Sequence, residues 1–600
     1  MTTSDNANKE KVTEFKQNLT KLEALSARFV ATLGNKKDLS TAINAPGSDL
    51  LVKATGAFWQ AYANDPSKLM VQQISYWGEA LKEFVRLQQA LSIPSNISEI
   101  EDDGNDDRFH HPLWKNNPYF KFVKDQYLRN AEIMREAING LEALDETQVR
   151  RLSYFTDQII DMMAPTNFLA TNPEALEKAV KTQGQSLIDG LENLISDMEA
   201  YDGELVVRLV DESAFTLGEN IATTQGQVVF RNHLHELIQY KSTTDLVHEL
   251  PLIIFPPWIN KFYVLDLKAQ NSFIKWAVDQ GFNVFVVSWV NPDESYKNIG
   301  IEDYIQDGFL TALDTARSIS VTEQVNAVGY CIGGTVLALT LALLKRRGEK
   351  PVSAATFFTT LTDFSEQGDF LPFLQNDFID GIEHEVQKKG ILKSYVMART
   401  FSFLRSNDLV YAPAINSYLL GNTPPAFDLL YWNGDGTNLP GKMALQYLKG
   451  LCQKDKFANE GFELFGVNVK LTDIDVPVYA IGCETDHIAP WTDSFRGVQK
   501  MGSKSKRFVL SQSGHIAGII NPPSKKKYGH YMNDDLEKSS DDWLVNAKFI
   551  PGSWWTDWGE WLAQKSGATK TAKLPGSDNF IPICDAPGNY VRMSSKPNKK

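Results

Sequence analysis

The sequence predicts an α/β fold with a mostly parallel central sheet, preceded by a helical region. Two observations predict this fold. After about residue 205, short β-rich runs alternate with helical ones, and one of these runs ends in a glycine-rich turn that leads into an apolar helix. Before residue 205 helical spacing dominates, as in segments 125–144 and 173–200. We therefore expect a helical N-terminal domain over residues 1–205 and an α/β domain over residues 206–600.

The expected strands are short apolar runs bounded by turn residues: Val228–Phe230, Leu252–Phe255, Val284–Trp289, Asn326–Tyr330, Ala355–Thr359, Val476–Ile481 and Arg507–Leu510. This alternation stops between about residues 363 and 471. That stretch contains aromatic-rich helical segments and several prolines, but no obvious strand. Ligands bind at the edge of such sheets, where long insertions carry specificity. The insertion is therefore expected to be a cap, with a second small structural domain as the alternative.

Composition excludes several classes of protein. The hydrophobic fraction of 43% and the aromatic fraction of 11% fit a soluble globular protein. A net charge of −14 without a basic stripe argues against nucleic-acid binding. The polar N-terminus lacks the apolar core of a signal peptide, so we expect a cytoplasmic protein without a membrane span. Four scattered cysteines match neither metal-ligand spacing nor a disulfide scaffold, and no metal is expected.

The apolar run 325–344 contains GYCIGG at residues 329–334. Its length approaches that of a membrane span, but clustered glycines disfavour a continuous helix and favour a tight turn. The run then divides into a buried strand ending at Tyr330 and an apolar helix from Gly333. Cys331 lies between them, in the nucleophile position of the pattern G-x-nucleophile-x-G. The positive end of the following helix favours a thiolate there. A small buried cysteine without chemistry is the alternative.

A nucleophile on such a turn needs an acid and a histidine, which follow it in that order on loops after late strands. Asp486 follows the expected strand 476–481, and His515 follows the strand that ends at Leu510. Because the order and both loop positions agree, we expect Cys331, Asp486 and His515 to form a catalytic triad. His487 is a competing base, but adjacent residues on an extended loop point in opposite directions. A supporting contact is the expected role of His487.

Several motifs together resemble polyhydroxyalkanoate synthases. They occur in order along most of the chain: APTNFLATNP (164–173), PLIIFPPWINKFYVLDL (251–267), GYCIGG (329–334), ETDHIAPW (484–491), SGHIAGIINPP (513–523) and GSWWTDW (552–558). The resemblance implies an α/β-hydrolase fold with Cys331 as nucleophile and with Asp486 and His515 as its partners. It also places Trp432 and Arg405 in family-typical stretches near the substrate.

The class I members that this chain resembles polymerise short-chain (R)-3-hydroxyacyl-CoA esters into polyester. The resemblance therefore implies an acyltransferase without a cofactor, because coenzyme A is part of the substrate and leaves as product. It further implies a homodimer on cytoplasmic polyester granules, with granule-coat proteins as possible partners. Cysteine suits this reaction because exchange between two thioesters keeps the acyl group activated.

The oxyanion of the reaction is expected to lie against backbone N–H groups. One belongs to Ile332, directly after the nucleophile, and a second belongs to the loop Pro256–Asn260, with Ile259 and Asn260 as candidates. Three other functions remain open. A hydrolase or thioesterase with the same triad would use water as acceptor, and a non-catalytic granule-associated protein would not need the triad. A depolymerase would act on preformed polyester and release monomers without coenzyme A.

Overall fold

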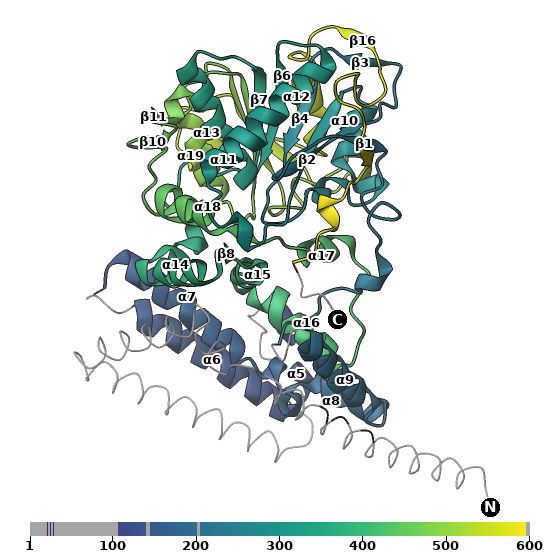
Figure 1. The fold of residues 1–600 in the computed structure, drawn as a ribbon. Helices are drawn as coiled ribbons and strands as arrows, with labels where there is room; N and C mark the ends of the chain where they lie inside the picture. Colours follow the sequence, from purple (N-terminus) through teal and green to yellow (C-terminus); the bar gives the residue numbers. More distant parts are fainter. Residues whose placement is uncertain are drawn as a thin grey trace, which may run out of the picture. The chain divides into compact units, whose positions relative to one another are not determined.

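The structure, a computed structural model, describes residues 106–139, 144–200 and 205–595, together with Lys21, Leu25 and Arg28. The chain divides into two compact units (Figure 1). Unit 1 comprises Met1–Leu209 and Ser402–Pro425, and unit 2 comprises Val210–Phe401 and Ala426–Lys600. The part of the expected N-terminal helical domain that precedes residue 106 lies, apart from the three residues just named, outside the described residues. No helix within the described part of the chain is long and apolar enough to cross a membrane.

Unit 2 is built on an eleven-stranded sheet with the strand order β15-β14-β13-β12-β7-β6-β4-β5-β2-β1-β17. From β5 to β13 all neighbouring strands in this order are parallel. The strands are β1 (Gly226–Arg231), β2 (His235–Tyr240), β4 (Leu252–Phe255), β5 (Val284–Trp289), β6 (Val325–Tyr330), β7 (Val352–Phe358), β12 (Val478–Cys483), β13 (Lys506–Ser511), β14 (His530–Met532), β15 (Lys548–Ile550) and β17 (Cys584–Asp585). A mostly parallel sheet is confirmed.

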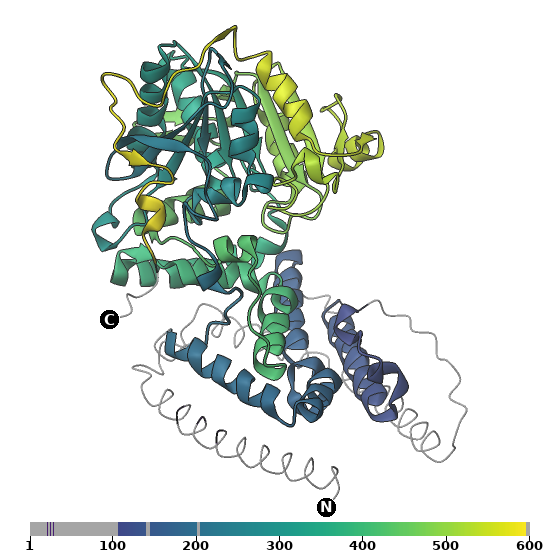
Figure 2. The same cartoon turned by 90° about the vertical axis from the view of Figure 1, so that its right-hand side faces the viewer.

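The parallel strands are buried because helices cover the sheet (Figure 2). These helices include α10 (Phe273–Asp279), α12 (Thr311–Ser320), α13 (Ile332–Arg347), α19 (Trp491–Lys500) and α21 (Trp555–Ala563). The tryptophans at the start of α21 belong to the main hydrophobic core, where Trp554, Trp555 and Trp558 are fully buried.

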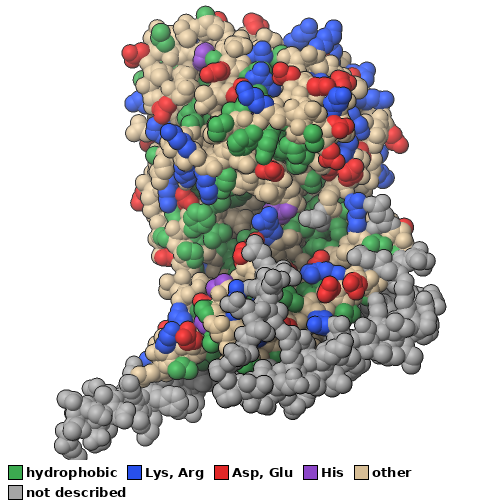
Figure 3. Space-filling view, turned by 180° about the vertical axis from the view of Figure 1, so that it is seen from behind, with side chains coloured by type: hydrophobic (Ala, Val, Ile, Leu, Met, Phe, Trp, Pro, Cys, Tyr) green, Lys and Arg blue, Asp and Glu red, His purple; other side chains and the backbone are tan. Residues whose placement is uncertain are grey.

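On the face shown in Figure 3, acidic and basic side chains are interspersed, and hydrophobic side chains gather between them.

The sheet domain differs from expectation in its edge strands and in the insertion. The strands β2, β14, β15 and β17 were not expected. In β2 the buried residues include Glu236 and Gln239, which interrupt the apolar pattern. The insertion 363–471 was expected to lack strands, which is wrong. It contains β8 (Ile391–Leu392) paired with β9 (Leu439–Pro440), and β10 (Phe462–Leu464) paired with β11 (Val467–Val469). Strands of two or three residues are too short for alternation to be recognised in sequence.

The described helices of unit 1 are α5 (Leu113–Asn116), α6 (Pro118–Asn139), α7 (Glu146–Met162), α8 (Pro173–Lys181) and α9 (Gln185–Ala200). Segment 173–200, which shows helical spacing throughout, is divided by a turn in which Gln183 and Gly184 have positive φ. A small core of aromatic and aliphatic side chains holds α5, α6 and α7 together; it includes Phe109, Trp114, Phe120, Tyr127 and Ile160.

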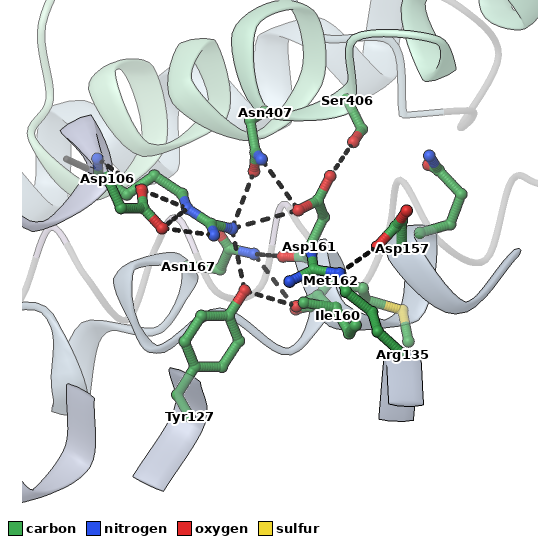
Figure 4. Close-up of polar contacts among 12 residues, drawn as sticks. Asp106, Tyr127, Arg135, Asp157, Ile160, Asp161, Met162, Asn167, Ser406 and Asn407 are labelled. Atoms are coloured by element: carbon green, nitrogen blue, oxygen red, sulfur yellow. Dashed lines mark hydrogen bonds and ion pairs between the residues drawn. The ribbon is translucent and has the colours of Figure 1, made fainter. Parts of the chain in front are cut away.

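Unit 1 also takes up part of the insertion that was expected to be a cap. The segment Ser402–Pro425 packs with the N-terminal helices, and one of its contacts is a polar cluster around Asp161 (Figure 4). The carboxylate of Asp161 accepts hydrogen bonds from Arg108, Asn407 and Ser406, at 3.2, 2.9 and 2.5 Å. The rest of the insertion stays in unit 2 and includes α14 (Asn376–Lys389), most of α15 (Ser394–Phe403), α17 (Asp428–Asn433) and α18 (Gly441–Leu445).

Candidate active site

Cys331 lies at the tip of a sharp turn between β6 and α13, in the position expected for a nucleophile. Its φ and ψ are 52° and −125°, and its N–H donates to the carbonyl of Phe358 at 2.9 Å. Positive φ is strained for a residue with a Cβ, and such strain gathers at functional sites. The half-exposed thiol therefore projects from a turn that the surrounding sheet holds in place.

Two glycines explain why the chain can turn so sharply. A Cβ on Gly329 would lie 2.4 Å from the Cα of Gly334, so the end of β6 and the start of α13 pack backbone against backbone. A Cβ on Gly333 would lie 2.4 Å from the carbonyl oxygen of Phe255, at the end of β4. The turn is thus pressed against the segment that begins the Pro256–Asn260 loop.

His515 and Asp486 are paired next to this turn. The Nδ1 atom of His515 lies 2.7 Å from Oδ2 of Asp486, and both side chains are buried. The other carboxylate oxygen of Asp486 accepts the N–H groups of Ile488 and Ala489, each at 2.9 Å. Because Nδ1 is engaged with Asp486, Nε2 is the ring nitrogen left to hydrogen-bond the Cys331 side chain. The structure therefore brings the three expected triad residues together.

The electrostatics of this group favour a protonated imidazole. Burial alone would lower the pKa of His515, but the charges of Asp486 and Cys331 and hydrogen bonds to both raise that pKa to about 10. The backbone around the imidazole is also held, because the buried hydroxyl of Tyr330 donates to the His515 carbonyl at 3.0 Å. A cysteine next to a histidine that a carboxylate orients is the typical arrangement of a cysteine nucleophile and its base.

A cavity of about 60 Å³ opens beside Cys331 and lies entirely within unit 2. Its lining is mostly apolar and comes from the sheet edge and from the insertion: Ile259, Cys331, Ile332, Thr335, Thr359, Leu361, Phe364, Gln367, Phe370, Leu392, Met397, Phe401, Leu439, Met443, Ala444, Tyr447, Leu448, Cys452, Ile488 and Ala489. Such a lining disfavours water and can hold an aliphatic acyl group.

The oxyanion candidates have different surroundings. Ile332 is the first residue of α13, so its N–H has no acceptor within the helix. Ile259 lines the cavity, and its carbonyl accepts the N–H of Thr437 at 2.9 Å. The side-chain amide of Asn260 instead donates to the carbonyl of Asn433 at 3.3 Å. Ile332 and Ile259 are therefore the two candidates that meet at the cavity.

Three other expected residues do not line the cavity. Trp432 is buried in the main core, and its indole N–H donates to the carbonyl of Lys261 at 2.6 Å. Arg405 belongs to unit 1, where its guanidinium lies 3.6 Å from the Asp408 carboxylate. His487 is half-buried beside Asp486. No cluster of three or more His, Cys, Asp or Glu side chains among the described residues could hold a metal ion.

Sequence reasoning missed five polar residues of the cavity: Thr335, Thr359, Gln367, Tyr447 and Cys452. Thr359 had a detectable signal, because it directly follows the strand beside the one that carries Cys331. Tyr447 and Cys452 lie in the insertion, with no pattern that marks them. Burial raises the pKa of the Cys452 thiol well above its usual range, so this second thiol of the cavity stays neutral.

Comparison with known proteins finds relatives over most of the chain. Residues 105–277 match the family described as Poly-beta-hydroxybutyrate polymerase (PhaC) N-terminus, and residues 251–522 match the alpha/beta hydrolase fold, which confirms the expected fold. The Poly(3-hydroxyalkanoate) polymerase subunit PhaC of Cupriavidus necator is 41% identical over 529 residues, which cover 86% of this chain and 87% of that protein. The Poly(3-hydroxyalkanoate) polymerase of Methylorubrum extorquens is 39% identical over 544 residues, 89% of each chain.

Proposed function

Because this chain belongs to the family of poly(3-hydroxyalkanoate) polymerases, we propose that it joins (R)-3-hydroxyacyl groups from coenzyme A thioesters into a polyester through an acyl group carried on Cys331. The observation that supports this role is the strained Cys331 turn next to the 2.7 Å pair of His515 and Asp486, at the mouth of an apolar cavity. The monomer that we expect is 3-hydroxybutyryl-CoA.

Loading begins with the thiol proton on Nε2 of His515. The Cys331 thiolate attacks the thioester carbonyl, and the oxyanion that forms takes hydrogen bonds from the N–H of Ile332 and from a second N–H in the Pro256–Asn260 loop. The carbon–sulfur bond to coenzyme A then breaks. The leaving thiolate takes a proton from the imidazolium, which leaves an acyl thioester on Cys331 and a neutral His515 ready to act as base.

Elongation requires an alcohol as the next nucleophile. His515 accepts the proton of the incoming 3-hydroxyl, whose oxygen attacks the acyl-cysteine carbonyl and forms an ester while Cys331 leaves as a thiolate. An alcohol is much harder to deprotonate than a thiol, so a correctly oriented imidazole matters more in this step. The apolar lining of the cavity favours the hydroxyacyl group over water, and this preference separates a polymerase from a hydrolase.

The test compares two thiols of the same cavity. Cys331→Ala should remove both coenzyme A release and insoluble polyester when the purified protein is mixed with (R)-3-hydroxybutyryl-CoA, and Cys331→Ser should be nearly as inactive. Cys452→Ala is the matched control and should keep most of the activity, because its neutral thiol is not paired with His515. Polymer formation by Cys331→Ala would refute the nucleophile. Release of coenzyme A with free hydroxy acid and no polymer would favour a hydrolase.

The proposed cellular location follows from the polyester product, which is insoluble. We propose that the protein works as a homodimer in the cytoplasm, on the surface of polyester granules, where granule-coat proteins are further partners. Fluorescently tagged protein should move from a diffuse distribution onto granules when polymer accumulates. A diffuse distribution in cells full of polymer would contradict this placement.

A further inference from the structure

Thr359 combines two unusual features at the edge of the sheet. It directly follows β7, lines the cavity, and has a φ of 38°, which is strained for a β-branched residue. The side chain is fully buried, and its hydroxyl has no hydrogen-bond partner among the described residues. A buried hydroxyl without a partner destabilises the folded protein, and strained backbone is typical of functional sites.

The other hydroxyls of the cavity are engaged. Thr335 donates to the carbonyl of Leu361 at 2.7 Å. The phenol of Tyr447 hydrogen-bonds Cys452. Thr359 is therefore the cavity hydroxyl that is left for a ligand.

The position of Thr359 relative to the nucleophile follows from strand register. Tyr330 and Phe358 are paired on the parallel strands β6 and β7, so the next residues, Cys331 and Thr359, are also neighbours across the sheet edge, where strands lie about 4.8 Å apart. On the other side of β6 lies β4, which leads into the Pro256–Asn260 loop. The nucleophile is thus flanked by the oxyanion loop on one side and by Thr359 on the other.

We propose that the Thr359 hydroxyl hydrogen-bonds the oxygen on C3 of the acyl group carried by Cys331, and so selects 3-hydroxyacyl groups over plain acyl groups. The inference rests on the proposed loading of Cys331. When the thioester oxygen faces the loop after β4, trigonal geometry directs C2 and C3 of the acyl chain away from that loop and towards the β7 side. A hydroxyl can donate to or accept from the C3 oxygen.

The experiment measures the burst of coenzyme A on rapid mixing with (R)-3-hydroxybutyryl-CoA or with butyryl-CoA, which lacks the 3-hydroxyl. The full-length protein should load the hydroxyacyl group faster, because a site that hydrogen-bonds a hydroxyl discriminates against an analogue without it. Thr359→Val keeps the branched shape and should reduce that ratio by roughly tenfold. Thr359→Ser should keep the ratio, and Thr359→Ala is a second variant without the hydroxyl.

The matched control is Thr340→Val. Thr340 is fully buried in α13, donates to the Val336 carbonyl at 2.7 Å and does not line the cavity. Thr340→Val should leave the ratio unchanged and lower the thermal midpoint. Thr359→Val should maintain or raise the midpoint of the ligand-free protein, because it removes an unpaired hydroxyl. A purely structural role for Thr359 would not produce this combination.

Two results would overturn the inference while leaving Cys331 as nucleophile. One is an intact burst with the same substrate ratio in Thr359→Val as in the unchanged protein. The other is an equal loss of loading with both thioesters, which would mean that Thr359 shapes the turn without touching the C3 oxygen. If the unchanged protein gives no burst with either thioester, the proposed function itself fails and the inference fails with it.

Discussion

His515 is a buried imidazole that two side chains hold in its protonated form. Its raised pKa has a consequence for stability, because a group that binds its proton more tightly in the folded state stabilises that state wherever the proton is bound. In the unfolded chain the pKa of histidine is about 6.5, and in the folded protein that of His515 is about 10. The contribution is therefore complete below pH 6.5 and disappears as the pH rises through about 10.

Asp486→Asn removes the carboxylate whose charge and hydrogen bond raise the pKa of His515. The difference in thermal midpoint between the unchanged protein and Asp486→Asn should be largest below pH 6.5 and should shrink between pH 7 and pH 10. Thermal melts in a series of buffers of constant ionic strength measure this difference in midpoint at each pH. A difference that grew with pH would contradict a protonated His515.

The same substitution should affect the two chemical steps unequally. A thiol has a pKa of about 8.5 and is far easier to deprotonate than an alcohol. Asp486→Asn should therefore leave the coenzyme A burst within about tenfold of normal, while steady-state elongation falls by about a hundredfold or more. His515→Gln is the comparison variant and should lose both phases. Equal losses of burst and steady state in Asp486→Asn would reduce Asp486 to orienting the imidazole for both steps.

At the scale of elements, the active site depends on how β6, its turn and α13 fit against β4. The helix begins directly at the nucleophile, and Gly333 in its first turn packs against the backbone at the end of β4. The same contact that makes the turn compact therefore also sets the distance between Cys331 and the candidate oxyanion loop.

Gly333→Ala tests this contact. The new methyl group would lie 2.4 Å from the Phe255 carbonyl and 2.8 Å from the Pro256 carbonyl, so the loop has to shift. We expect loading to fall by about a hundredfold, because displacement of about 1 Å is enough for such a loss. The control is Gly381→Ala in the exposed part of α14, where the new methyl would have no described atom within 4 Å apart from the helix's own nearby backbone and the two chain neighbours. That variant should stay active and gain about 0.5–1 kcal/mol. Normal loading by Gly333→Ala would show that the loop is not the oxyanion site.

At the scale of the whole molecule, the chain leaves unit 2 after Phe401, joins unit 1 over Ser402–Pro425 and returns at Ala426. The cavity residues Leu392, Met397 and Phe401 lie within the ten residues that precede this segment. The N-terminal helices contact Ser402–Pro425 at several points, and one of these is Asp161, whose carboxylate accepts hydrogen bonds from Arg108, Ser406 and Asn407 (Figure 4).

Asp161→Ala should therefore loosen the start of this segment, around Ser406 and Asn407. The Asp161 side chain is 15% exposed, and without it Arg108 and Asn407 each lose a hydrogen-bond acceptor. We expect this loss to lower the free energy of unfolding by about 2–3 kcal/mol. Asp157→Ala on the same helix is the control: its side chain is 48% exposed and pairs with Arg135, so the cost should stay below about 1 kcal/mol. Thermal melts and protease cleavage within residues 402–425 measure both. Equal effects of the two substitutions would contradict the anchoring role of Asp161.

The sequence by itself determined the turn at Cys331, the central strands and the chain order of the triad, because these depend mainly on residues close together in the chain. GYCIGG required a sharp turn, because its glycines permit backbone contacts that other residues prevent, and apolar runs located β4, β5 and β6 within one or two residues. The chain order of nucleophile, acid and histidine was readable for the same reason, since each follows the end of a strand.

Only the tertiary structure decided which distant side chains share the cavity. Tyr447 and Cys452 lie more than a hundred residues from Cys331, in an insertion without a strong pattern, and their proximity depends on how that insertion packs. Trp432 was expected near the substrate but fills the core, and Arg405 was carried into unit 1. Such placements follow from packing of the whole chain, because burial and hydrogen-bond partners are set by residues far away in sequence.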